Sequence, residues 1–171
     1  MENLGKPYKL LENGIAQIAL VVKDLDLAVE NYWIIFGIGP WHFYTYKRPL
    51  LSMSRYHGQD VDNTLRIALS YFGPTRIELI EVKAGPSLQE DFIGIHGYGV
   101  QHLGILVDDM EKAIEEARSK GFEIIQEGSG FGPDGDGHYA YLNTEKEFGI
   151  TYELIERPKR RHKPEKIFPP E

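Results

Sequence analysis

The 171-residue chain contains no cysteine, which excludes a disulfide framework, a thiolate metal site and a cysteine nucleophile. Basic residues are in the minority, because 19 Lys and Arg against 26 Asp and Glu give a net charge of −7. That balance predicts no general affinity for nucleic acid or for an anionic membrane surface. The sequence also lacks an apolar run long enough to span a membrane, and its first residues lack the apolar stretch of a signal peptide. We therefore expect a cytoplasmic protein that has neither nucleic acid nor membrane as a partner.

The sequence contains an internal repeat. Residues 15–29 (IAQIALVVKDLDLAV) are similar to residues 100–114 (VQHLGILVDDMEKAI), and RIELIE at 76–81 is similar to TYELIE at 151–156. Apolar residues make up 42% of the chain, which is enough to bury a sizeable core. We therefore expect one domain built from two similar halves.

Each half is predicted to follow the order β-α-β-β-β. Buried apolar runs and turn signals predict strands at 15–22, 41–47, 64–72 and 75–82, and again at 100–107, 122–127, 138–145 and 149–156. A helix is expected in each half, between Asp24 and Gly37 and between Asp108 or Asp109 and Gly121. The chain then divides into an N-terminal arm (1–13), a first module (14–84), a linker (85–98), a second module (99–157) and a basic, Pro-rich tail (158–171) that is expected to be irregular.

The two modules differ in length. Gln17 and Glu78 are 78 − 17 = 61 residues apart, whereas His102 and Glu153 are 153 − 102 = 51 residues apart. The extra residues fall in the first module between its second and third strands, in a segment predicted to be a loop. Such an insertion either covers a cavity or is a tolerated surface loop, and the sequence leaves both interpretations open.

Two polar residues interrupt the buried first strands at equivalent places. Gln17 and His102 each lie two residues before a small residue, Ala19 or Gly104, on the same face of the strand. In a plain core we would expect larger residues to fill that space. The small neighbours therefore leave room beside each polar side chain.

The last strands of the two modules each carry a carboxylate, Glu78 or Glu153. Burying an unpaired charge costs several kcal/mol or more, so each must be exposed, paired or bound to a metal. For Glu78, a salt bridge with Arg76 is the simpler alternative. Four such residues at equivalent positions nevertheless favour a metal site, and two carboxylates, an imidazole and an amide oxygen suit one divalent ion such as Zn, Ni, Co or Mn.

These residues give the chain a resemblance to the vicinal oxygen chelate superfamily, the glyoxalase/bleomycin resistance/dioxygenase group, over about residues 14–157. The segments IAQIALVVKDLDLAVENYWIIFGIG and HGYGVQHLGILVDDMEKAIEEARSKG resemble the openings of the two modules in its methylmalonyl-CoA epimerase-like and glyoxalase-like branch. The resemblance implies an α+β fold in which two βαβββ modules form a curved eight-stranded mixed sheet around a central metal site. It implies a homodimer and the metal ligands Gln17, Glu78, His102 and Glu153.

The resemblance also implies an activity. A metal-dependent enolising enzyme is expected, either an epimerase or isomerase or a glyoxalase-type lyase, acting on a small substrate with two vicinal oxygens such as a 2-acyl thioester or a 2-oxo hemithioacetal. The order Gln, Glu, His, Glu is similar to that of zinc-type glyoxalase I, whereas methylmalonyl-CoA epimerases typically have His at the first position and often Gln at the second. Proton transfer needs a base beside the reacting carbon, and Glu153 is the first candidate and Glu78 the second.

Further side chains are candidates for substrate binding. An acyl-CoA substrate would need cationic contacts for its phosphates, and aromatic rings of the strands could line an apolar pocket. These candidates are Arg76, Trp41, Tyr46, Arg48, Arg55, Tyr139 and Tyr141.

Two other functions remain as alternatives. A non-catalytic binding or resistance protein of the same fold generally lacks the metal ligands, so the complete set here argues against it. A ring-cleaving dioxygenase uses two His and one carboxylate on iron, and Gln17 leaves a single His among the four positions.

Overall fold

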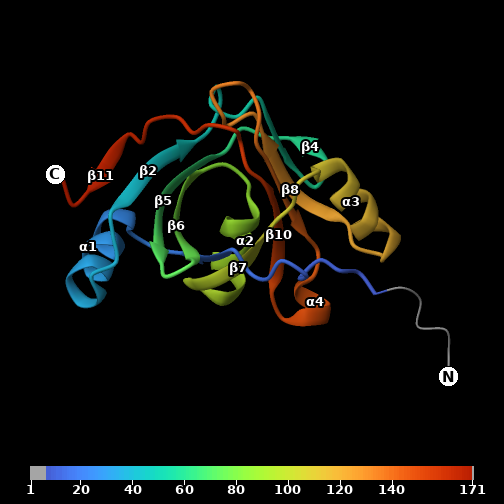
Figure 1. Ribbon diagram of the computed structural model, residues 1–171, viewed down its shortest axis with the longest axis horizontal. Coiled ribbons are helices and arrows are strands. Elements are labelled where there is room, and N and C mark those ends of the chain that lie inside the picture. The colour runs from blue at the N-terminus through green and yellow to red at the C-terminus, as the bar shows by residue number, and fades with distance from the viewer. Residues whose placement is uncertain (1–6, 171) are drawn as a thin grey trace.

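The computed structural model describes residues 7–170; residues 1–6 and 171 lie outside the described residues, and with them part of the predicted N-terminal arm. Over residues 7–170 the strands form one strongly curved eleven-stranded sheet (Figure 1). The first module comprises β1 (Gln17–Val21), α1 (Leu25–Phe36), β2 (Trp41–Tyr46), β5 (Thr64–Phe72) and β6 (Thr75–Ala84). The second module comprises β7 (Gly99–Leu106), α3 (Met110–Ser119), β8 (Ile124–Ser129), β9 (His138–Leu142), the short helix α4 (Glu145–Phe148) and β10 (Thr151–Glu156). The predicted α+β fold of two repeated modules is confirmed.

Helix α1 begins and ends where the sequence predicts. The Asp24 carboxylate accepts a hydrogen bond from the backbone N–H of Leu27 at 3.0 Å, which satisfies one of the free donors of the first turn. Gly37 ends the helix in the left-handed conformation, with φ 66°. In α3, Asp109 caps the first turn in the same way through the N–H of Lys112. The two helices lie at opposite ends of the curved sheet in Figure 1.

The centre of the sheet contains the first and last strand of each module, in the order β6-β1-β7-β10. Strands β1 and β6 are parallel, as are β7 and β10, and the two modules meet where β1 runs antiparallel to β7. The register at this junction places Gln17 opposite Gly104 and Ala19 opposite His102. The strands of the two repeated segments, β1 and β7, therefore lie side by side.

The extra strands come from segments that we predicted to be irregular. The insertion of the first module forms β3 (Met53–Tyr56) and β4 (Gln59–Asp60), and β3 pairs with β8 of the second module. The tail forms β11 (Lys166–Phe168), which pairs with β2 of the first module. The predictions of a loop and of an irregular tail are wrong at these places. Both segments cover strands that would otherwise be sheet edges with unpaired backbone groups, which explains eleven strands instead of eight.

The segment predicted as a linker contains a helix, α2 (Leu88–His96). Ser87 caps it by accepting a hydrogen bond from the N–H of Glu90 at 3.1 Å. Leu88 packs with Phe131, Tyr139 and other buried residues of the second half. The linker is therefore part of the core that lies beneath the candidate site.

Apolar clusters fill both faces of the sheet. Leu25 and Val29 of α1 pack with Trp41 on one face, and Met110 of α3 packs in the corresponding cluster of the second half. No helix within residues 7–170 is both long and apolar enough to cross a membrane.

Candidate metal centre

Four polar side chains converge on one point of the sheet, one from each of the four central strands. The amide nitrogen of Gln17 lies 3.0 Å from a carboxylate oxygen of Glu78, 3.0 Å from one of Glu153 and 3.3 Å from Nε2 of His102. The same His102 nitrogen lies 3.1 Å from Glu153 and 3.5 Å from Glu78. All four residues are at most 8% exposed. The structure therefore brings together the four residues that the repeat singles out.

The space for this cluster depends on the two small residues. A Cβ atom on Gly104 would lie 2.6 Å from Ile155, 2.8 Å from the Cβ of Gln17 and 3.3 Å from a Glu153 oxygen. Ala19 has the equivalent place in the first module, next to both Glu78 and His102 in the strand register. A larger residue at Gly104 would displace two of the four polar side chains.

The ring orientation of His102 is set by a residue that the sequence did not single out. Gln101 Oε1 lies 2.7 Å from Nδ1 of His102. Adjacent residues of a strand normally point to opposite faces, but the β1–β7 register shifts at Gln101, and a β-bulge of this kind redirects side chains. If Nδ1 donates its proton to Gln101, Nε2 is left as a free acceptor that faces the carboxylates.

The protonation of His102 depends on the two carboxylates beside it. Burial by itself would lower the pKa of His102, but Glu153 and Glu78 outweigh burial and raise the pKa to about 9. Two buried carboxylates therefore favour a cation at the position of this ring.

The donor set fits a divalent metal ion. Glu78, His102 and Glu153 each offer one ligand atom, and these atoms lie within 4.8 Å of one another. The amide nitrogen of Gln17 contacts all three, so they already face a common point. The Gln17 oxygen instead accepts a hydrogen bond from Nε of Arg76 at 2.6 Å. Ligation by Gln17 would need its amide oxygen to face the carboxylates, so its role as a fourth ligand stays a prediction.

A small cavity of about 20 Å³ opens beside the cluster. Tyr139 contributes a buried hydroxyl that has no hydrogen-bond partner among the described residues. Burial raises the pKa of Tyr139, so its hydroxyl stays protonated and available as a donor. Tyr46 stacks on Phe131 with ring centroids 5.5 Å apart and closes another side of the cavity.

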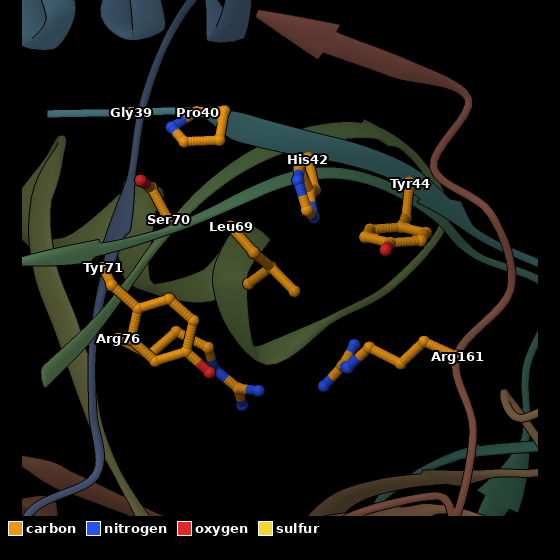
Figure 2. A pocket seen from close by; sticks show the side chains of 9 residues that line it. All are labelled: Gly39, Pro40, His42, Tyr44, Leu69, Ser70, Tyr71, Arg76 and Arg161. Carbon is orange, nitrogen blue, oxygen red and sulfur yellow. The ribbon is translucent and has the colours of Figure 1, made fainter. Parts of the chain in front are cut away.

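A second, larger pocket of about 210 Å³ adjoins the cavity (Figure 2). The two spaces share Leu69, Arg76 and Arg161 in their walls. The pocket therefore continues the inner cavity toward the outside of the first module.

The predicted substrate-binding residues are distributed unevenly. Tyr46, Tyr139 and Arg76 line the inner cavity, and the Tyr141 ring packs edge-on against His102 with centroids 4.9 Å apart. The other three candidates, Trp41, Arg48 and Arg55, lie away from the four-residue cluster.

Three of the predicted contacts lie outside the cavity. Trp41 is completely buried in the core beneath α1, and its Nε1 donates to Ile38 O, because odd-numbered residues of β2 face the helix. Arg55 lies on β3, where it forms ion pairs with Asp60 and Glu127. Arg48 lines a separate groove of about 630 Å³. The placement of Trp41 and Arg55 in the site is therefore corrected.

Besides Ile155, sequence reasoning missed four residues of the site. Leu69 and Phe131 read as ordinary core residues, and Gln101 reads as facing away from His102. Arg161 belongs to the tail, and only the pairing of β11 with β2 shows why this segment passes the cavity. None of the four carries a local sequence signal that marks it as part of a site.

The chain belongs to the Glyoxalase/Bleomycin resistance protein/Dioxygenase superfamily, whose family model matches residues 16–141. Among curated proteins it is similar to a 2-epi-5-epi-valiolone epimerase from Actinomyces sp, with 31% identity over 151 residues that cover 85% of this chain and 80% of the relative.

Solved structures share the fold. A methylmalonyl-CoA epimerase from Mycobacterium tuberculosis has a TM-score of 0.63 and 22% identity, over 85% of this chain and 89% of that one. A Streptomyces coelicolor methylmalonyl-CoA epimerase variant in complex with 2-nitronate-propionyl-CoA has a TM-score of 0.64 and 18% identity, over 86% and 96%. The chain is thus an epimerase-like member of the superfamily.

Proposed function

We propose that the protein is a metal-dependent epimerase that inverts a carbon next to a carbonyl group. The observation that carries the proposal is the position of two buried carboxylates, Glu78 and Glu153, from different modules, on the wall of one cavity. Inversion of such a carbon needs a proton to leave and to return, and two carboxylates supply one group for each step. The epimerase names of the curated relative and of the structural neighbours support the same reaction type.

Glu78, His102 and Glu153 would hold the ion, and Gln17 would join them through its amide oxygen. A bound divalent ion polarises a carbonyl and stabilises the negative charge of an enolate. The Zn, Ni, Co or Mn expected from the donor types remain the candidates.

The remaining chemistry falls to side chains of the chain itself. Glu153 is our first choice for the base that removes the proton, and Glu78 is the second. For inversion, the carboxyl group on the opposite face must take up a proton from solvent before it returns one, and each group would act through an oxygen that does not hold the ion. Tyr139 lines the cavity with both carboxylates, and its hydroxyl, which has no hydrogen-bond partner among the described residues, would donate a hydrogen bond to a substrate oxygen. Phe131 and Tyr46 shield this proton transfer from bulk water.

We infer that the substrate is a small hydroxylated ketone rather than an acyl-CoA. A ketone with a neighbouring hydroxyl has the two vicinal oxygens expected for this superfamily, and the curated relative is named for a valiolone. Arg55, one of the cations considered for acyl-CoA phosphates, is already in ion pairs with acidic side chains. The cavity and the adjoining pocket of about 210 Å³ suit a compact molecule.

The test combines metal analysis with exchange of substrate hydrogen for solvent deuterium. Purified protein should carry about one divalent ion per chain and should exchange the hydrogen next to the carbonyl of hydroxy ketones. Parallel assays with 2-acyl thioesters and 2-oxo hemithioacetals decide between substrate classes. Glu153→Ala should abolish exchange, whereas Glu147→Ala, which removes an exposed carboxylate on α4, should leave exchange unchanged. Full metal content and full exchange in Glu153→Ala would refute the site.

A further inference from the structure

Two arginines face each other across the pocket that adjoins the metal centre. Arg76 extends from β6, Arg161 extends from the segment before β11, and their guanidinium groups point toward one another in Figure 2. Both side chains also line the inner cavity. They therefore stand where the cavity opens into the pocket.

Neither arginine is neutralised by a direct ion pair with a carboxylate anywhere in residues 7–170. Arg76 uses its Nε to hold the Gln17 oxygen, and Arg161 donates a hydrogen bond to the Tyr46 hydroxyl. Only 6% of Arg76 is exposed, so its charged form has lost most of its hydration. By contrast, Arg160, the neighbour of Arg161 in the chain, is paired with Asp134.

Arg76 and Arg161 lack a counter-charge once the metal centre is counted. The carboxylates of Glu78 and Glu153 contribute two negative charges, and a divalent ion at the centre would balance both. The two arginines would then remain as two positive charges, one of them buried, with no counter-charge of their own. A buried charge of this kind is normally paired.

The surroundings restrict what an anionic partner can be. The pocket is small, and Tyr44, Tyr71 and His42 line it together with the arginines. Guanidinium groups match the planar, two-oxygen geometry of carboxylate and phosphate. A space of about 210 Å³ accepts one such group on a short carbon chain.

We propose that Arg76 and Arg161 form an oxyanion subsite that binds a carboxylate or phosphate group carried by the substrate. This inference rests on the proposed function, because it places the reacting ketone at the metal centre and its anionic group in the adjoining pocket. The substrate class is then a hydroxy ketone with one carboxylate or phosphate. Arg161 also contacts Tyr46 but none of the four candidate ligands, whereas Arg76 orients Gln17.

The experiment compares binding of charged and neutral hydroxy ketones by calorimetry on the protein as purified. Dihydroxyacetone and dihydroxyacetone phosphate form one pair. 1-Hydroxy-2-pentanone and 5-hydroxylevulinate, which carries a carboxylate at the end of the same carbon chain, form the other. The wild-type protein should bind the anionic member of at least one pair about 10-fold or more tightly, and the pair with the larger ratio identifies phosphate or carboxylate. Each ratio cancels the contribution of the shared hydroxy ketone, including its contacts with the metal.

Arg161→Gln should reduce the preferred ratio to about one, and Arg161→Lys should keep part of it because the charge remains. Arg160→Gln is the matched control, since it removes an equal charge from the adjacent residue and should preserve the ratio. A thermal melt of each variant verifies that it is folded. Equal affinity for charged and neutral members in the wild-type protein, or a ratio that survives in folded Arg161→Gln, would overturn the subsite. An Arg161-dependent ratio without deuterium exchange would sustain the subsite and refute the epimerase function.

Discussion

The two halves of the sheet are built alike around the metal centre but are covered differently. In the second half, Tyr141 is the strand partner of Glu153 and packs against His102. In the first half, the strand partner of Glu78 is Leu69, which lines the open pocket. The same backbone plan thus produces a closed aromatic wall on one side and an entrance on the other.

This difference makes the two sides of the site unequal although the fold is duplicated. Two equal halves would present the same surface to both ends of a substrate. Leu69 of the first half stands at the position equivalent to Tyr141 of the second half. Because leucine is smaller than tyrosine, the pocket beside Arg76 is open in the first half. The ligand positions are unequal as well, because Gln17 stands where the second module has His102. Three predictions follow from this inequality, in order of decreasing effect.

The largest effect should come from the first ligand position of each module. His102→Ala removes an imidazole ligand and should lower metal affinity on the order of 100-fold or more, because no neighbour can replace the nitrogen. Gln17→Ala removes a weaker amide donor that is also held by Arg76, and should lower affinity about 10-fold or less. Metal titration of both variants measures the difference. Equal losses would mean that the two modules contribute equally to the ion.

An intermediate effect should follow from making the halves alike. Leu69→Tyr places a phenol ring in the wall shared by the cavity and the pocket, and should lower kcat/KM about 10-fold while metal content stays unchanged. Leu69→Met conserves volume and should have little effect. Steady-state kinetics with a substrate identified by deuterium exchange measures both. Full activity in Leu69→Tyr would show that the substrate enters by another route.

The smallest effect concerns pH and the protein treated with a chelator. The folded-state pKa of His102, about 9, lies above its ordinary value of 6.5, so the charged ring stabilises the fold fully below pH 6.5. That stabilisation should be lost as pH rises through about 9. Denaturant unfolding across this range measures it, and His102→Asn should remove most of the slope. In the metal-loaded protein the trend should reverse, because the metal binds the neutral ring.

The repeat made much of this arrangement predictable. Local patterns predict the strand periodicity and the caps Asp24 and Gly37. Comparison of the two halves of the sequence predicts that Gln17 and His102 occupy equivalent positions. The candidate metal ligands are predictable because each is a polar residue in an otherwise apolar strand. Duplication thus supplied a comparison within one chain.

The rest depends on contacts between distant parts of the chain. Arg161 is placed by the pairing of β11 with β2, and nothing in the tail itself indicates that pairing. Gln101 reaches His102 only because of a bulge, which strand alternation alone does not predict. The aromatic character of Trp41 suggests a place in the site, whereas the alternation of side chains along β2 decides which face it occupies. The homodimer expected from the resemblance stays a prediction.

The edge strands connect the two halves of the sheet. The insertion of the first module covers β8 of the second, and the chain beyond the second module returns to cover β2 of the first. A cut in the linker would therefore leave β8 without β3 and β2 without β11, and exposed edges of this kind promote aggregation.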